Sequence, residues 1–125
     1  MSSIISTGYL LVDYSIILGL IAIGIGAVLA PLQSSKIYGI QAQAGSSQQF
    51  VKAMGARDIA LGIVGFSIRS TLLETTWLIF VIAVACFSAV DGWLVYRAGD
   101  RGRWHLHLAA GALLAAYAAV IWLLR

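Results

Sequence analysis

The sequence predicts an all-α polytopic membrane protein, an antiparallel bundle of four transmembrane helices. Composition is the first reason: 61% of the 125 residues are hydrophobic and 10% are charged, against roughly 25% charged residues in a typical soluble domain. A single domain of this length is too small to bury so much apolar side chain in a water-soluble core. The second reason is that four apolar stretches approach the length of about 20 residues that a helix needs to cross a bilayer.

The four expected spans cover residues of about 9–31, 50–68, 75–96 and 104–124. The first is not a cleaved signal, because no basic segment precedes its apolar part. A polar loop, residues 32–49, rich in Ser and Gln, joins the first two spans. The other links, "RSTLLE" and "RAGDRGR", are so short that they permit only antiparallel hairpins. Residues 1–125 are therefore expected to form one up-and-down bundle.

Small residues predict which helix faces touch. On the first span, the spacing that lets helix backbones approach closely in lipid is present at Ala22, Gly26 and Ala30. On the second span, four residues share one face at helical periodicity: Gly55, Asp58, Gly62 and Gly65. Asp58 is thus expected to point into the bundle over a glycine-lined groove.

The distribution of basic residues predicts the orientation. The side with the long loop and the "RAGDRGR" hairpin carries Lys36, Lys52, Arg97, Arg101 and Arg103, and the side with both termini carries Arg69 and Arg125. The positive-inside rule then places the long loop in the cytoplasm and both termini across the membrane. The tryptophans are expected to form an interfacial belt: Trp77, Trp93, Trp104 and Trp122. Asp13, Arg69 and Glu74 are expected at the opposite interface from the long loop.

Arg57 and Asp58 interrupt the apolar run "VKAMGARDIALGIVGF", and Asp91 lies at a similar depth on the antiparallel third span. His105 and His107 enter the last span from the same surface. A charge in the hydrocarbon costs about 2.5 kcal/mol or more, and such residues usually mark a functional site. Two interpretations remain open at this point: a structural ion pair that joins the helices, and a catalytic group of acids and bases.

Several chemistries are excluded or disfavoured. The single Cys86 rules out a disulfide framework and a metal site built on paired cysteines. There is no Ser nucleophile motif and no Gly-rich phosphate loop, so no metal or cofactor is expected. The net charge of +3 is spread along the chain, which indicates basic residues beside membrane spans rather than a nucleic-acid partner.

Two carboxyl groups bridged by an arginine suit acid–base catalysis, because one can stay protonated in a low-dielectric site while the other stays ionised. Opening of an epoxide uses such a pair, and an Asp-Arg-Asp arrangement is known in soluble limonene-type epoxide hydrolases, which are similar in chemistry only. We expect Asp91 as the acid, Asp58 as the base, Arg57 to orient both, and His107 to relay a proton. Substrate contacts are expected from Tyr38, Gly62 and Ser88. A proton-coupled carrier and a non-catalytic partner subunit remain alternatives, and a homodimer stays open.

The stretches "GARDIALGI" and "DGWLVYRAG", with a His early in the last span, resemble a family of small microbial four-helix membrane proteins, a domain of unknown function. The pattern G-x-R-D-x-x-L-G corresponds to Gly55, Arg57, Asp58, Leu61 and Gly62, with Asp91 and His107 as the later matching residues. The likeness runs from about "APLQSSKIYGI" to the end. Similar proteins are associated with natural-product pathways, so the resemblance implies a membrane enzyme that hydrolyses, cyclises or rearranges a lipophilic epoxide.

Overall fold

The computed structural model describes residues 2–40, 42, 45–71, 74–98 and 103–124. These residues form five α-helices: α1 (Ser2–Leu29), α2 (Pro31–Tyr38), α3 (Ser46–Ser70), α4 (Glu74–Ala98) and α5 (Trp104–Leu123). The expected all-α class is confirmed for the described part of the chain. Of the residues used for the orientation, Arg101 and Arg125 lie outside the described residues.

The main difference from the expected elements is α2, which lies within the segment predicted as a polar loop. Pro31 occupies the first turn of α2, where its fixed φ suits a helix and its missing N–H is not needed. Gly39 ends the helix at φ 81° and donates its N–H to the Lys36 carbonyl at 3.3 Å. A glycine in the left-handed backbone conformation is a common end of an α-helix. The Ser- and Gln-rich composition concealed this short helix, because its apolar pattern is weak.

Three helical segments are long and apolar enough to cross a membrane: Gly8–Leu29, Glu74–Arg97 and Trp104–Leu123. They indicate a multi-pass membrane protein. Large apolar side chains lie exposed on these helices, among them Leu11, Leu29 and Leu113, as expected where lipid rather than water is the solvent. The helix α3 is not one of the three, because its residues include Lys52, Arg57, Asp58 and Arg69 and begin with the polar run "SSQQ".

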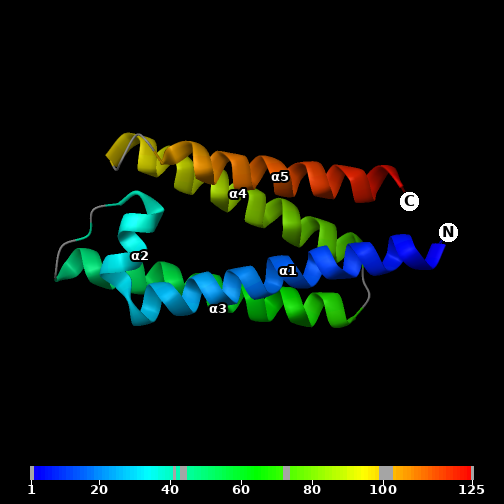
Figure 1. Ribbon diagram of the computed structural model, residues 1–125, viewed down its shortest axis with the longest axis horizontal. Coiled ribbons are helices and arrows are strands. Elements are labelled where there is room, and N and C mark those ends of the chain that lie inside the picture. Colours follow the sequence, from blue (N-terminus) through cyan, green and yellow to red (C-terminus); the bar gives the residue numbers. More distant parts are fainter. Residues whose placement is uncertain (1, 41, 43–44, 72–73, 99–102, 125) are drawn as a thin grey trace.

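The long helices pack as two pairs, α1 with α3 and α4 with α5 (Figure 1). The pairs lie closest together near the two chain termini and separate toward the other end (Figure 1). The short helix α2 lies between them at that separated end. The hydrophobic core is on the terminal side of the bundle, around Ile17 of α1, Trp77 and Val81 of α4, and Ala118 of α5.

Backbone contact holds the α1–α3 pair together. A Cβ atom built on Gly55 would lie only 2.6 Å from the Gly24 carbonyl oxygen and 2.8 Å from the Ala27 Cβ. The expected small-residue stripe on α1 was therefore wrong in detail, since Ala22 is exposed and a Cβ on Gly26 would meet only the Ser34 hydroxyl at 3.8 Å. The face in contact carries Gly24 and Ala27, which are three residues apart and outside the four-residue pattern, and the position of α3 decides which face is used. On α3 the expected face is confirmed, with Gly55, Asp58, Gly62 and Gly65 all buried.

Trp77 also departs from its expected place. It was expected in an interfacial belt, but it is 3% exposed and stacks against Phe80 in the core. The other expected belt members differ from it, since Trp93 and Trp122 are exposed and Trp104 is half-buried. Trp77 can be buried because its indole N–H has a hydrogen-bond acceptor inside the protein, Asp13.

Candidate functional site

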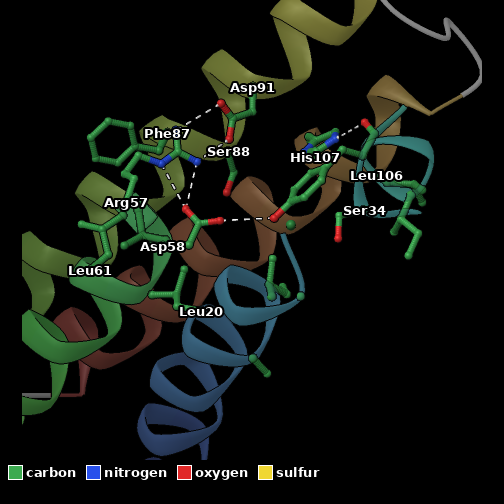
Figure 2. Close-up of a pocket in the computed structure, with 17 residues that line it drawn as sticks. Leu20, Ser34, Arg57, Asp58, Leu61, Phe87, Ser88, Asp91, Leu106 and His107 are labelled. Atoms are coloured by element: carbon green, nitrogen blue, oxygen red, sulfur yellow. Dashed lines mark hydrogen bonds and ion pairs between the residues drawn. The ribbon is translucent and has the colours of Figure 1, made fainter. Parts of the chain in front are cut away.

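Arg57 is the centre of a cluster formed by α3 and α4. Its Nε and Nη2 atoms each donate to Asp58 Oδ1 at 3.0 Å. The same guanidinium donates from Nη2 to Asp91 Oδ2 at 3.1 Å and from Nη1 to Asp91 Oδ1 at 3.5 Å. Figure 2 shows the two carboxylates on either side of the Arg57 fork. Arg57 therefore turns toward Asp58 and Asp91 rather than outward to lipid headgroups, and one cation bridges two carboxylates from two helices.

The cluster is largely shielded from solvent. The exposed fractions of the side chains are 7% for Asp58, 15% for Asp91 and 32% for Arg57. Phe87 covers the guanidinium, with the Arg57 Cζ atom 5.4 Å from the centre of its ring, a cation–π distance. The sequence reading missed Phe87, although it lies four residues before Asp91 and therefore on the same face of α4.

Tyr38, at the end of α2, completes the coordination of Asp58. Its hydroxyl donates to Asp58 Oδ2 at 3.2 Å (Figure 2). Burial, followed by the nearby negative charge of Asp58, raises the pKa of the Tyr38 hydroxyl well above its ordinary value of about 10. Tyr38 is therefore a neutral hydrogen-bond donor at physiological pH.

His107 reaches the cluster through Tyr38, and no hydrogen bond or ion pair joins it to Asp58 or Asp91. Its Nε2 lies 2.9 Å from the Tyr38 backbone oxygen, and because a carbonyl only accepts, this nitrogen carries the proton. The two rings are also stacked, with centroids 6.0 Å apart and an angle of 12° between planes. His105 is exposed and packs edge-on against Trp104. Of the two histidines, only His107 belongs to the site.

A cavity of about 580 Å³ lies beside this cluster, with walls from all five described helices. Tyr38, Arg57, Asp58, Asp91 and His107 line it (Figure 2), and so does Ser88. Most other lining residues are apolar, which is typical of a site for a small lipophilic molecule. Gly62 does not line the cavity, because it packs against the Ile21 side chain and the Ile17 carbonyl of α1. Its small size serves the helix contact.

Within the described ranges, no group of three or more His, Cys, Asp or Glu side chains is placed to hold a metal ion. The polar groups that face the cavity include two carboxylates already bridged by a guanidinium, together with a tyrosine hydroxyl, His107 and two serines, Ser34 and Ser88. This set can donate a proton, accept one, and orient a polar atom between the two carboxyl groups.

A second polar cluster lies near the chain termini and is centred on Asp13, which is 1% exposed. Asp13 accepts hydrogen bonds from Arg69 Nε at 2.7 Å, Trp77 Nε1 at 2.6 Å and the Tyr117 hydroxyl at 2.5 Å. Asp13 and Arg69 were expected at the membrane interface opposite the long loop; the structure shows that α1, α3, α4 and α5 enclose them. The sequence reading missed Tyr117, and no local pattern pointed to it.

Comparison with known families adds one finding. Residues 18–123 match a family described as Domain of unknown function (DUF4267). The match includes every residue of the Arg57 cluster and its cavity. Neither a curated protein nor a solved structure matches the chain significantly.

Proposed function

We propose a function from the site itself, because this chain belongs to the family Domain of unknown function (DUF4267), whose description names no activity. The protein is an integral membrane enzyme that opens a lipophilic epoxide by acid–base catalysis, in secondary metabolism. Hydrolysis, cyclisation and rearrangement share the ring-opening step and differ in what happens to the carbon that loses the oxygen.

The observation that carries the proposal is a single guanidinium bonded to two carboxyl groups on the wall of a mostly apolar cavity. With both carboxyl groups ionised, the three side chains carry a net charge of about −1, which is costly in a shielded site. One additional proton makes the group neutral. Arg57, Asp58 and Asp91 thus favour a state with one carboxylic acid and one carboxylate, which is the pair that the reaction needs.

The hydrogen bonds support a division of the two roles. Asp58 accepts two bonds from Arg57 and one from Tyr38, so its negative charge is the better stabilised. Among the described residues Asp91 is bonded to Arg57 alone, one of these two bonds is long, and its side chain is more exposed than that of Asp58. We therefore assign the acid role to Asp91 and the base role to Asp58.

In the proposed reaction, Asp91 transfers its proton to the epoxide oxygen as the C–O bond breaks. The electron pair of that bond stays on the oxygen, which becomes a hydroxyl group. Asp58 accepts a proton from the attacking water in hydrolysis, from a substrate hydroxyl in cyclisation, or from carbon in rearrangement. Proton transfer from Asp58 to Asp91 restores the starting state. The reaction is redox-neutral, so it needs no redox cofactor.

The proposal includes a four-span topology with α3 as the fourth membrane helix. α3 has 25 residues and packs lengthwise against α1 (Figure 1). Its two central charges are bonded to each other, and Arg57 is also bonded to Asp91, which lowers the cost of placing them in the membrane. Lys36, Lys52 and Arg97 favour a cytoplasmic location for the α2 end of the bundle, so the termini are outside.

The test is turnover of a lipophilic epoxide by the purified protein in nanodiscs, with a chelator present and no nucleotide or flavin. We expect activity, and we expect Asp91→Asn to lower turnover by about 10²-fold or more while the protein still folds, because the amide cannot donate an acidic proton. Glu74→Gln is the matched control, the same change at an exposed position of α4, and should be fully active. Absolute dependence on a metal or redox cofactor would exclude the mechanism.

The same preparation separates the enzyme from a proton-coupled carrier. In sealed liposomes, the enzyme should open the epoxide at a rate that does not respond to an imposed pH gradient. Uptake of a solute driven by the gradient, without conversion of an epoxide, would favour the carrier instead. An inactive protein whose Asp91→Asn variant is only less stable would favour the structural ion pair.

A further inference from the structure

Helix packing closes two of the seams around the cavity. Between α1 and α3 the backbones touch at Gly24 and Gly55, where even one added carbon would be 2.6 Å from a carbonyl oxygen. Between α4 and α5, a Cβ on Gly111 would lie 3.0 Å from the Ala85 carbonyl oxygen, and one on Gly92 would lie 3.2 Å from the His107 Cβ. No ligand can pass between helices in such contact.

Side chains close two further sides. The α3–α4 side is bridged by the Arg57–Asp91 ion pair at 3.1 Å and covered by Phe87. The end toward α2 is held by two bonds to its last turn, from His107 to the Tyr38 carbonyl at 2.9 Å and from Arg103 to the Ile37 carbonyl at 3.3 Å. Below the cavity, the residues that form its floor also pack on the hydrophobic core: Leu20, Leu61 and Val84.

Among the described residues, the side without such contacts is the gap between α1 and α5. These helices meet near the termini, where the Tyr117 hydroxyl bonds to the Tyr9 carbonyl. Toward the cavity, α1 contributes Ala22 and Ile23, and α5 contributes Leu106 and Ala110. All four line the cavity and are also exposed, Ile23 at 52% and Leu106 at 55%. Ile37 of α2 and Phe87 of α4 also line the cavity and are exposed, but the bonds described above close those two sides. At the α1–α5 border, no bond joins the two helices among the described residues that line the cavity, and this border is apolar.

We propose that this α1–α5 gap is a binding subsite for the apolar part of an elongated substrate, with the reactive oxygen placed inward between Asp58 and Asp91. The proposal rests on the proposed function and adds the shape of the substrate to it. The polar groups lie at the inner wall of the cavity, and the apolar border lies at its opening. Only a molecule with its oxygen function near one end can bond to the polar groups and also keep its apolar part against the border. Its apolar remainder then extends into the lipid, where it stays in contact with hydrocarbon and costs no exposure to water.

The first experiment compares Ala110→Phe with Ala112→Phe in nanodiscs. Ala110 lies in the gap, whereas Ala112 is exposed on α5 and does not line the cavity, so the control has the same change in size. Terminal epoxides of increasing chain length, from epoxyhexane to epoxyhexadecane, serve as substrates. We expect Ala110→Phe to lower the ratio of kcat/KM for the longest over the shortest substrate by about tenfold or more, and Ala112→Phe to leave it unchanged. Equal ratios in the two variants would overturn the proposal.

The second experiment does not depend on catalysis. A hexadecanol with a diazirine group in the middle of its chain is photolysed with the protein in nanodiscs, and the cross-links are mapped by mass spectrometry. We expect labelling on the α1 and α5 peptides that contain Ala22 and Ala110, and about tenfold less in Ala110→Phe than in Ala112→Phe. If the protein labels in this way but opens no epoxide, the proposed function fails and the subsite stands. Labelling that Ala110→Phe does not reduce would remove the subsite, whatever the activity.

Discussion

At the scale of single residues, the site depends on the shape of the Arg57 side chain. Three of its nitrogens donate to two carboxyl groups. A lysine ammonium has the same charge but is a point donor, and it cannot hold both carboxyl groups in this fixed arrangement. The requirement is thus for a guanidinium fork and not merely for a positive charge.

We therefore expect Arg57→Lys to fold and insert but to lose about 10²-fold in turnover, because misplaced acid and base groups cost that much. The measurements are epoxide turnover and thermal unfolding of the same preparation. Lys52→Arg, the reverse exchange on the same helix and outside the cluster, is the control and should be fully active. An active but less stable Arg57→Lys protein would indicate that the cluster is structural.

Tyr38 allows a prediction about pH. Its pKa is raised in the folded protein by burial and by the Asp58 charge, whereas an unfolded tyrosine titrates near about 10. A group whose pKa is higher when folded stabilises the fold at pH values below the unfolded pKa, and this contribution is lost as the pH rises toward the folded pKa. Stability should therefore decrease as the pH rises above about 10.

The measurement is thermal unfolding at increasing alkaline pH for the wild type and Tyr38→Phe. Phenylalanine does not ionise, so the decrease should be smaller in the variant. At neutral pH the variant loses one hydrogen bond to Asp58, at a cost of about 1 kcal/mol. Identical alkaline profiles for the two proteins would show that Tyr38 is not held in the shielded position described above.

At the scale of helices, glycines decide how closely elements pack. Gly55 allows α1 and α3 to touch, and this contact sets the position of Arg57 and Asp58, two and three residues further along α3. Gly19 on α1 differs, because a Cβ there would meet nothing within 4 Å. The two positions form a matched pair for substitution by alanine.

Gly55→Ala should destabilise the protein by about 1–3 kcal/mol, the usual cost of overpacking, and should also lower turnover because α3 is displaced. Gly19→Ala should be neutral or stabilise by about 0.5–1 kcal/mol, since alanine favours a helix over glycine. Reversible unfolding in mixed detergent would measure both values. If Gly55→Ala were as harmless as Gly19→Ala, the close α1–α3 contact would be incorrect.

At the scale of the whole molecule, the Asp13 cluster joins the two helix pairs. Its members come from α1, α3, α4 and α5, and it lies at the end where the pairs converge (Figure 1). The Arg57 cluster lies at the end where the pairs separate and leave a cavity. The bundle thus has one end fastened by a buried charge network and one end that is hollow.

Asp13→Asn should lower the free energy of unfolding by about 3 kcal/mol, because it leaves the Arg69 charge without its counterion in a shielded place. Tyr117→Phe removes only a neutral donor and should cost about 0.6 kcal/mol, the usual value for a hydrogen bond in a membrane protein. Both variants should keep wild-type turnover per folded molecule, since neither residue lines the cavity. A loss of turnover without a loss of stability would contradict the separation of the two clusters.

The sequence alone determined what depends on local pattern and on solvent. Apolar length and short hairpins predicted the four long helices with ends within about four residues, except that α1 begins at Ser2 rather than near residue 9. Helical periodicity correctly placed Asp58 on a buried glycine face. The antiparallel arrangement also predicted that Arg57, Asp58 and Asp91 would lie at one level, as the structure has them. These inferences succeed because each needs only the spacing along one helix and the direction of its neighbour.

Only the tertiary structure decided the contacts that depend on how the helices rotate and cross. It placed Gly24 rather than Gly26 against α3. It buried Trp77 beside Asp13 and brought Tyr117, more than a hundred positions away in the sequence, to the same carboxylate. It also placed the Tyr38 hydroxyl on Asp58, through a short helix that the polar composition concealed. A rotation of α1 by one residue would exchange its contact face, and the sequence offers several faces of similar polarity in lipid. Packing of small residues and satisfaction of buried polar groups select one of them, and both are properties of the assembled bundle.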